Sequence, residues 1–253
     1  MTPPTPLPWL EPGQPFPPVH KAWGENDPAP GLLAAGGVLD VETLVRAYSN
    51  GIFPWYGEGQ PILWWSTDPR MVLDPLCFKL HRSLRKTLQK LLREDRLQIR
   101  MDHSFDRVMR HCAQAPREGQ TGTWILPAMV QAYTRLHRSG MAHSVEAWID
   151  GELAGGLYCV NLGGAVFGES MFARKTDASK LALAALVAFA RVNNLPLIDC
   201  QQQTNHLASL GATPIARADF VRRIRQAQES PSPQWRFEPL YWNKLLPEHE
   251  TRA

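Results

Sequence analysis

Three polar residues beside two apolar stretches are the strongest candidates for chemistry. Glu169 follows one apolar stretch, and Asp199 and Gln201 follow another. Because side chains alternate along a strand, Asp199 and Gln201 should share one face, with Cys200 on the other. A carboxylate in such a position can bind a cationic group, accept a proton from an amine, or orient a hydroxyl group.

Both carboxylates also have structural interpretations. Glu169 is a surface carboxylate, a cap for the next helix, or a recogniser of a cationic group. Asp199 should be partly buried and therefore needs a partner, which is either a local arginine or a substrate amine. Ser170 has no His–Asp partners at suitable spacing, so an acyl-enzyme is not expected, and His206 is interpreted as structural.

A compact run of strands and one helix must position these residues. Period-two alternation and an alanine-rich stretch predict, in order, strands over 145–149, 153–160 and 165–167, a buried helix over 178–193 and a strand over 197–201. Asp150-Gly151 and Gly163-Gly164 are hairpin-turn signals between the first three strands. The three strands therefore form an antiparallel meander that leads into the helix and the last strand.

This order of elements resembles the GNAT acyltransferase fold, and the likeness does not by itself fix a reaction. GNAT enzymes hold the pyrophosphate of acetyl-CoA with a glycine-containing loop at the start of the helix. The equivalent loop here, residues 174–180, reads Arg-Lys-Thr-Asp-Ala-Ser-Lys and has no glycine. Acetyl-CoA is therefore disfavoured as a donor, and a GNAT acetyltransferase is kept as an alternative function.

Aromatic residues gather in the stretches 51–56 and 61–66, with Trp124 in a later polar loop. They form either a small aromatic core or a stacking wall for a base, and the two interpretations can apply to different residues. Trp64 and Trp65 are adjacent, so in a strand their side chains point to opposite faces.

The stretch 79–100 is basic on one side and carries leucines at helical spacing, which predicts an amphipathic helix. Its outer face is either simply solvated or a patch for nucleic-acid phosphates. The candidate phosphate contacts are Arg82, Arg85, Lys86, Lys90 and Arg93.

Composition excludes several classes of protein. The net charge of +3 is too small to argue nucleic-acid binding by itself. No apolar run approaches the ~18 residues of a membrane span, and no signal peptide is evident. The four cysteines form no CxxC pair and the histidines form no cluster, so we expect reduced thiols, no metal site and a cytoplasmic protein.

The fold class we predict is α+β, with a small N-terminal domain and a GNAT-like acyltransferase domain built on a mostly antiparallel sheet with helices. The predicted divisions are a proline-rich arm over 1–30, an aromatic-rich domain over 31–78, a catalytic domain over 79–229 containing the basic helix 79–100, and a tail over 230–253.

Several motifs in register resemble those of leucyl/phenylalanyl-tRNA–protein transferases. The resemblance covers roughly residues 16–225, and each motif is weak alone. The motifs are Gly31-Leu-Leu-Ala-Ala-Gly-Gly37, Gly51-Ile-Phe-Pro-Trp-Tyr56, the segment from Pro61 to Arg70, Thr123-Trp-Ile125, His143-Ser-Val-Glu146, Gly168-Glu-Ser-Met-Phe172, Ala178-Ser-Lys180, Leu197-Ile-Asp-Cys-Gln201 and His206-Leu-Ala-Ser-Leu-Gly211.

The resemblance implies a bacterial cytosolic enzyme that moves Leu or Phe, and Met less well, from aminoacyl-tRNA to a protein. The acceptor would be an N-terminal Arg or Lys, and the product would be marked for degradation by the N-degron route. No cofactor is implied. A non-catalytic tRNA-binding module is a further alternative, against which the acidic strand ends argue.

The resemblance also implies roles for individual residues. Trp55 and Trp124 would contact the 3′-terminal adenosine of the tRNA. The pocket for the donor side chain would be lined by Leu157, Met171, Leu186 and Ile198, and the acceptor and catalytic site would be formed by Glu169, Asp199 and Gln201.

The mechanism we expect is direct aminolysis of the aminoacyl ester by the acceptor's α-amine. That ester is already activated, so no metal, cofactor or acyl-enzyme is needed. The amine must be neutral to attack, and its usual pKa is about 7.7–8.0. Either Asp199 accepts its proton, directly or through Gln201, or the adenosine 2′-hydroxyl moves the proton and Asp199 only orients.

Overall fold

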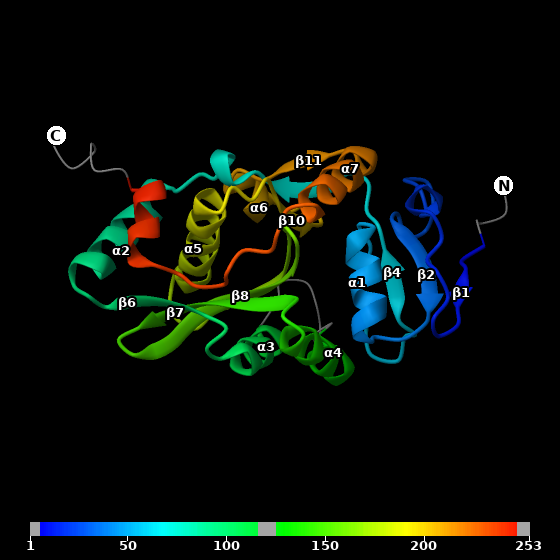
Figure 1. Ribbon diagram of the computed structural model, residues 1–253, viewed down its shortest axis with the longest axis horizontal. Coiled ribbons are helices and arrows are strands. Elements are labelled where there is room, and N and C mark those ends of the chain that lie inside the picture. The colour runs from blue at the N-terminus through cyan, green and yellow to red at the C-terminus, as the bar shows by residue number, and fades with distance from the viewer. Residues whose placement is uncertain (1–5, 116–124, 247–253) are drawn as a thin grey trace.

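Two β-sheets organise the chain, and helix α1 (Val41–Ser49) lies between them (Figure 1). The computed structural model describes residues 6–115 and 125–246. Asp40 begins α1 by accepting a hydrogen bond from the backbone N–H of Thr43 at 2.7 Å, as its N-cap position predicts. The buried face of α1 includes Leu44 and Tyr48, and the helix contacts both β3 and β8.

The smaller sheet has the strand order β1-β2-β4-β3. Its strands are β1 (Trp9–Leu10), β2 (Leu32–Gly36), β3 (Phe53–Pro54) and β4 (Leu63–Trp65). β1 pairs with β2 in parallel, and the other pairs are antiparallel. Trp64 on β4 is completely buried and donates to the carbonyl oxygen of Gly36 at 2.9 Å, so this tryptophan belongs to the aromatic core.

The larger sheet has seven strands in the order β11-β5-β10-β9-β8-β7-β6. Its strands are β5 (Arg70–Leu73), β6 (Leu97–Met101), β7 (Ala142–Ile149), β8 (Glu152–Leu162), β9 (Ala165–Ala173), β10 (Ile198–Gln201) and β11 (Thr213–Ile215). β7, β8 and β9 form the predicted antiparallel meander, and β10 pairs with β9 in parallel. Asp150 and Gly151 both have positive φ, at 57° and 77°, which is the geometry of a tight type I′ hairpin turn.

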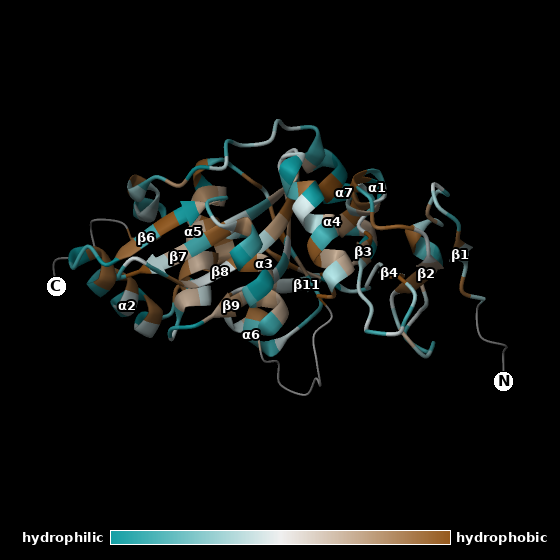
Figure 2. Ribbon diagram, turned by 90° about the horizontal axis from the view of Figure 1, so that it is seen from below, coloured by the Kyte–Doolittle hydropathy of each residue, from teal (hydrophilic) through white to brown (hydrophobic). Residues whose placement is uncertain are grey.

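Helices cover both faces of the larger sheet (Figure 1). α2 (Arg82–Arg93) and α5 (Ala178–Val192) pack on one face, and α3 (Phe105–Gln114) and α4 (Pro127–Arg138) pack on the other. Seen from the side of α3 and α4, both helices display hydrophilic residues (Figure 2). This arrangement confirms the predicted mixed fold, in which a meander leads through a buried helix into a parallel strand.

α5 is the central helix of its face and is buried along most of its length. It connects β9 to β10, the two strands that carry the candidate site residues. No helix within residues 6–115 and 125–246 is both long enough and apolar enough to cross a membrane.

The predicted basic helix over 79–100 is wrong in its bounds. α2 runs only from Arg82 to Arg93, and Asp95 takes a positive φ of 52° that ends the helical path. The residues after it alternate in polarity and form β6, which pairs antiparallel with β7 over 97–101. Leucine spacing indicates a helix only as far as Leu92, and the next apolar residues follow period two because they lie in a strand.

β5 lies in the larger sheet, between β10 and β11. Residues 70–73 therefore pack with the catalytic unit, and we propose a domain boundary near residue 69 in place of the predicted 78. The remaining short elements are the 3₁₀ helices η1 (Val19–Lys21), η2 (Pro75–Cys77) and η3 (Pro239–Lys244), and the helices α6 (Asn205–Ser209) and α7 (Arg217–Gln228). η3 contacts α5, so the segment after residue 230 folds back on the catalytic unit.

Candidate active site

The site lies where β9 and β10 separate. β10 pairs with β9 only through Ile198 and Asp199, whereas β9 continues to Ala173. Gly168 allows the two backbones to stay close just before they diverge, because a Cβ there would lie 3.1 Å from the carbonyl oxygen of Asp199. A cavity of about 100 Å³ opens beyond this point, bordered by both strands and by α5.

The cavity brings together all four side chains predicted to bind the donor. Leu157 on β8, Met171 on β9, Leu186 on α5 and Ile198 on β10 line it, together with Leu183 and Leu207, which the sequence analysis did not select. Its volume is well below the roughly 300–1,000 Å³ of pockets that enclose a whole ligand. The cavity therefore has the size and lining for one apolar side chain.

Glu169 lies at the border of this cavity, inside β9 and not at the strand end where we predicted it. β9 has a bulge at this residue, because Gly168 pairs with Cys159 and Ser170 pairs with Tyr158. A bulge redirects a side chain relative to the regular alternation. The carboxylate of Glu169 accepts hydrogen bonds from Tyr48 Oη at 2.7 Å, Gln201 Nε2 at 2.7 Å and Tyr133 Oη at 3.2 Å.

Burial raises the pKa of Glu169 to about 8, and the negative charge of Asp199 adds to this effect. The hydrogen bonds from Tyr48 and Tyr133 and the charge of Arg70 act in the opposite direction. The side chain thus exchanges its proton close to the pH at which an α-amine does. A carboxyl group with such a pKa is suited to accept a proton from an attacking amine.

Tyr48 and Tyr133 support Glu169 from two different helices, α1 and α4. Both are fully buried, and their hydroxyl groups also bond to one another. Burial, together with the nearby charge of Glu169, raises the pKa of both phenols well above the usual value. Sequence reasoning assigned neither residue to the site, although a tyrosine on the inner face of a helix signals a hydroxyl group that needs a buried partner.

Asp199 forms a buried ion pair with Arg70 of β5. Arg70 donates from Nε to Oδ1 at 2.8 Å and from Nη2 to Oδ2 at 2.6 Å, and both side chains are fully buried. The guanidinium group also lies between the rings of Phe53 and Phe220, 4.6 Å from each ring centroid. Of the two partners considered for Asp199, the structure contains the arginine, to which the sequence analysis gave no role.

Gln201 connects the ion pair to Glu169. Its backbone N–H donates to Oδ1 of Asp199 at 2.9 Å, and its side chain donates to Glu169 at 2.7 Å. β10 does not alternate regularly here, because the register with β5 shifts between Asp199 and Gln201, and Gln201 has a φ of +60°. Residues other than glycine seldom adopt this conformation, and such strain gathers at functional sites.

The predicted adenosine contacts lie apart from this cavity or outside the described residues. Trp55 is half-buried and packs against Trp65, with ring centroids 5.3 Å apart. Trp65 Nε1 donates to the carbonyl oxygen of Trp55 at 2.6 Å, which fixes the loop after β3. Trp124 falls outside the described residues, so its stacking role stays a prediction.

The predicted phosphate contacts lie on α2. Arg82, Lys86, Lys90 and Arg93 are exposed, and Arg85 is half-buried. Their spacing of three and four residues places the four exposed side chains along one side of the helix. Leu84, Leu88 and Leu91 anchor the opposite side in the core.

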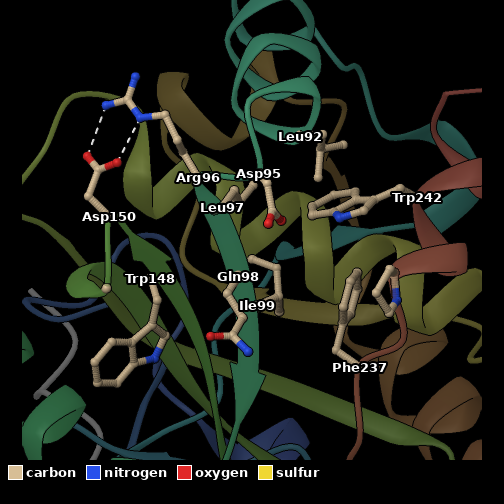
Figure 3. Close-up of a pocket in the computed structure, with 12 residues that line it drawn as sticks. Leu92, Asp95, Arg96, Leu97, Gln98, Ile99, Trp148, Asp150, Phe237 and Trp242 are labelled. Carbon is tan, nitrogen blue, oxygen red and sulfur yellow. Dashed lines mark hydrogen bonds and ion pairs between the residues drawn. The ribbon is translucent and has the colours of Figure 1, made fainter.

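A larger cavity of about 730 Å³ contains none of the predicted site residues (Figure 3). It lies between β6 and the C-terminal segment that includes Phe237 and Trp242. At its border the two oxygens of Asp150 accept hydrogen bonds from Arg96, which lowers the pKa of Asp150 to about 2. In the described ranges 6–115 and 125–246, no group of His, Cys, Asp and Glu is arranged to hold a metal ion.

An apolar cavity for one side chain, opened between two parallel strands and bordered by a carboxyl group with a raised pKa, is an arrangement suited to acyl transfer. Residues 72–225 match the family described as leucyl/phenylalanyl-tRNA protein transferase, and residues 37–68 match the N-terminal domain of the same family. The chain belongs to the leucyl/phenylalanyl-tRNA–protein transferase family and is an aminoacyltransferase.

Curated relatives agree over nearly the whole chain. The leucyl/phenylalanyl-tRNA–protein transferase of Polaromonas sp. (strain JS666) is 62% identical over 243 residues, which cover 96% of this chain and 95% of the relative. The protein of the same name from Paraburkholderia phytofirmans is 58% identical, over 92% of this chain and 95% of the relative. The one from Leptothrix cholodnii is 55% identical and covers 94% and 95%.

Solved structures show only distant likeness. L-PGS from Bacillus licheniformis has a TM-score of 0.37 and 10% identity over 70% of this chain and 57% of that one. A ribosomal-protein-alanine N-acetyltransferase from Brucella melitensis biovar Abortus 2308 has a TM-score of 0.31 and 14% identity over 56% and 96%.

Proposed function

We propose that this enzyme transfers Leu or Phe, and Met less well, from aminoacyl-tRNA to the α-amine of a protein that begins with Arg or Lys. The observation that carries the proposal is the cavity of about 100 Å³ that is lined by Leu157, Met171, Leu186 and Ile198 and ends at Glu169. It accepts one apolar side chain, while a charged side chain would lose its hydration among apolar lining residues.

The reaction we propose is direct aminolysis. The nitrogen atom of the neutral amine attacks the carbonyl carbon of the ester, the new C–N bond forms, and the bond to the 3′ oxygen of the tRNA breaks. The ionised carboxylate of Glu169 takes the proton that the nitrogen atom loses and then gives this proton to the departing 3′ oxygen, so that the carboxylate is regenerated. The pKa of about 8 supports this role, because it lies close to that of the amine.

Asp199 has a positioning role in this proposal. Both of its carboxylate oxygens already accept hydrogen bonds from Arg70, and Oδ1 also accepts from the backbone of Gln201. This arrangement holds Asp199 rigidly between β5 and β10. Asp199 fixes Gln201, which in turn orients Glu169, and well-oriented reacting groups contribute roughly 7–11 kcal/mol in favourable systems.

The acceptor proposal rests on the polar side of the cavity. Glu169 and Ser170 both line it and can accept hydrogen bonds from a cationic N-terminus. Through this activity the product would carry an N-terminal Leu or Phe and enter the N-degron route, and a cytoplasmic location follows from the use of aminoacyl-tRNA.

The deciding experiment measures transfer of labelled Leu from Leu-tRNA to a peptide that begins with Arg and to one that begins with Asp. We expect transfer to the Arg peptide alone. Transfer to neither peptide would overturn the proposal. Calorimetry with acetyl-CoA provides the comparison with a GNAT acetyltransferase, and we expect no binding.

A further inference from the structure

A second group of basic side chains lies on α3, on the opposite face of the larger sheet from α2. Arg107 lies three and four residues before Arg110 and His111, and Gln114 lies four and three residues after them, so all four share one side of the helix. Together with Arg174, which directly follows β9, they line a cavity of about 350 Å³. All five side chains are able to donate hydrogen bonds.

The arginines of this α3 cluster have no acidic partner among the described residues. Over residues 6–115 and 125–246, Arg110 and Arg174 form no ion pair, and the guanidinium of Arg107 lies 5.3 Å from the ring centroid of Trp148. Asp106 is the one acidic residue of α3, and it accepts a hydrogen bond from Thr134 at 3.2 Å.

Some surface arginines elsewhere are held by acidic partners, whereas others, such as Arg82 and Arg138, have none among the described residues; the α3 cluster differs in that its three arginines converge on one cavity. Arg96 pairs with Asp150 at 2.7 Å, and Arg222 pairs with Asp219 at 2.7 Å. Guanidinium groups that converge without a carboxylate repel one another unless an anion lies between them. The geometry of the α3 cluster therefore fits an external anion, and planar guanidinium groups match phosphate well.

The pKa of His111 responds to the positive charges of the cluster. Its ring packs against Phe172 of β9, with centroids 4.8 Å apart. Burial lowers the pKa of His111, and the charges of Arg174, Arg107 and Arg110 lower it further. His111 and the three arginines line the same cavity, so they can face a single bound anion.

The position of the cluster relates it to the active site. β9 runs from Glu169 at the cavity to Ala173, the residue before Arg174. Five residues of strand cover about 17 Å at roughly 3.3 Å each. A stacked nucleic-acid strand carries one phosphate about every 3.4 Å of its axis, so this length corresponds to about five nucleotides, and the path from the α5 side of the sheet to the α3 side adds to it.

We propose that Arg107, Arg110 and Arg174 bind phosphodiester groups near the aminoacylated end of the donor tRNA, as a contact separate from the one expected on α2. This inference rests on the proposed function and deepens it. α2 would hold the tRNA from one side of the sheet, and the α3 cluster would hold the strand that leads to the cavity.

The test measures binding of tRNA to the full chain by fluorescence anisotropy at several salt concentrations. The variants are Arg110→Glu and Arg174→Glu, with Arg138→Glu on α4 as a control of equal charge change. We expect each cluster variant to weaken binding about tenfold and to reduce the slope of log affinity against log salt by about 0.7–0.9 for each phosphate that the variant no longer binds. An affinity and slope equal to those of the control would overturn the inference, as would weaker binding at unchanged slope.

Two additions keep the outcome clear. If thermal unfolding shows that the glutamate variants are destabilised, Arg110→Gln and Arg174→Gln are used in their place. Arg110→Lys keeps the charge and should bind tRNA more tightly than Arg110→Glu. NMR titration of His111, assigned with His111→Asn, should show its pKa rising when a short RNA with the tRNA 3′ sequence is added. A rise with inorganic pyrophosphate but not with the RNA would assign the cluster to a free diphosphate and overturn the tRNA contact.

The same proteins separate this inference from the proposed function. If the wild type transfers Leu to the Arg peptide while the cluster variants bind tRNA like the control, only the inference fails. If the wild type transfers nothing, the proposed function fails, and weaker tRNA binding by the cluster variants would then show binding without that activity.

Discussion

Arg70 and Asp199, which are 129 residues apart in the sequence, form a bidentate ion pair with hydrogen bonds of 2.8 and 2.6 Å. Both side chains are completely buried. The pair joins β5 to β10 at the point where β10 leaves β9. It also sets the backbone of Gln201, which accounts for the position of the amide that contacts Glu169. The site is therefore organised by a side chain that belongs to neither of the two strands that form the cavity.

Removing one partner of this pair should destabilise the protein strongly. Arg70→Met leaves Asp199 as an uncompensated buried charge, and the expected loss in the free energy of unfolding is about 3–5 kcal/mol. The double variant Arg70→Met/Asp199→Leu should recover much of that loss while remaining inactive. Urea unfolding measures the free energy of unfolding of the single and the double variant. A double variant no more stable than the single one would contradict this account.

Glu169→Gln should reduce the single-turnover rate of transfer by roughly 10²–10⁴-fold, the usual contribution of a proton acceptor. The wild-type rate should rise with pH through about 8, because the carboxylate is the active form. The acceptor amine titrates in the same range. The informative comparison is therefore between the pH–rate profiles of the wild type and of Glu169→Gln, and we expect the profile of the variant to be less steep. If the two proteins had equal rates and equally steep profiles, Glu169 would not be the proton acceptor.

Glu169 should also make stability depend on pH. Its pKa is raised from 4.5 to about 8 in the folded protein, so between these values the folded state binds a proton that the unfolded state does not. The free energy of unfolding then falls as the pH rises from about 4.5 to about 8. Urea unfolding of the wild type and of Glu169→Gln should show this fall in the wild type and a flatter dependence in the variant.

The donor pocket should control the choice of amino acid. Leu186→Ala enlarges the cavity and should shift the ratio of kcat/KM for Phe over Leu by about tenfold or more, since one methylene is worth roughly 10–200-fold in an apolar pocket. Leu88→Ala on α2 is the matched control, because Leu88 is equally buried but does not line the cavity. A shift of the same size in the control would assign the effect to general destabilisation.

The basic side of α2 should contribute to tRNA affinity without sequence preference. Lys86→Glu and Lys90→Glu should weaken binding of every tRNA tested and reduce the salt slope by about 0.9 for each duplex phosphate contact. Arg222→Glu on α7 serves as the control. Equal slopes in all three variants would show that α2 lies outside the tRNA interface.

The sequence by itself determined the parts of the structure that depend on local periodicity. The meander, its Asp150-Gly151 turn and the buried helix α5 follow from turn signals and from patterns of period two and 3.6, whereas the apolar residues at the cavity were expected from the family resemblance. The same rule explains the error over 79–100, where leucine spacing stops at Leu92 and a strand follows.

Only the tertiary structure decided how the polar groups are paired. Tyr48 and Glu169 are separated by 121 residues, and Arg70 and Asp199 by 129, so no local pattern connects them. The bulge at Glu169 and the positive φ of Gln201 also depend on contacts with neighbouring strands. A buried carboxyl group requires a hydrogen-bonding partner. The amino-acid sequence around it does not specify that partner, because any donor that the fold brings within hydrogen-bonding distance can serve.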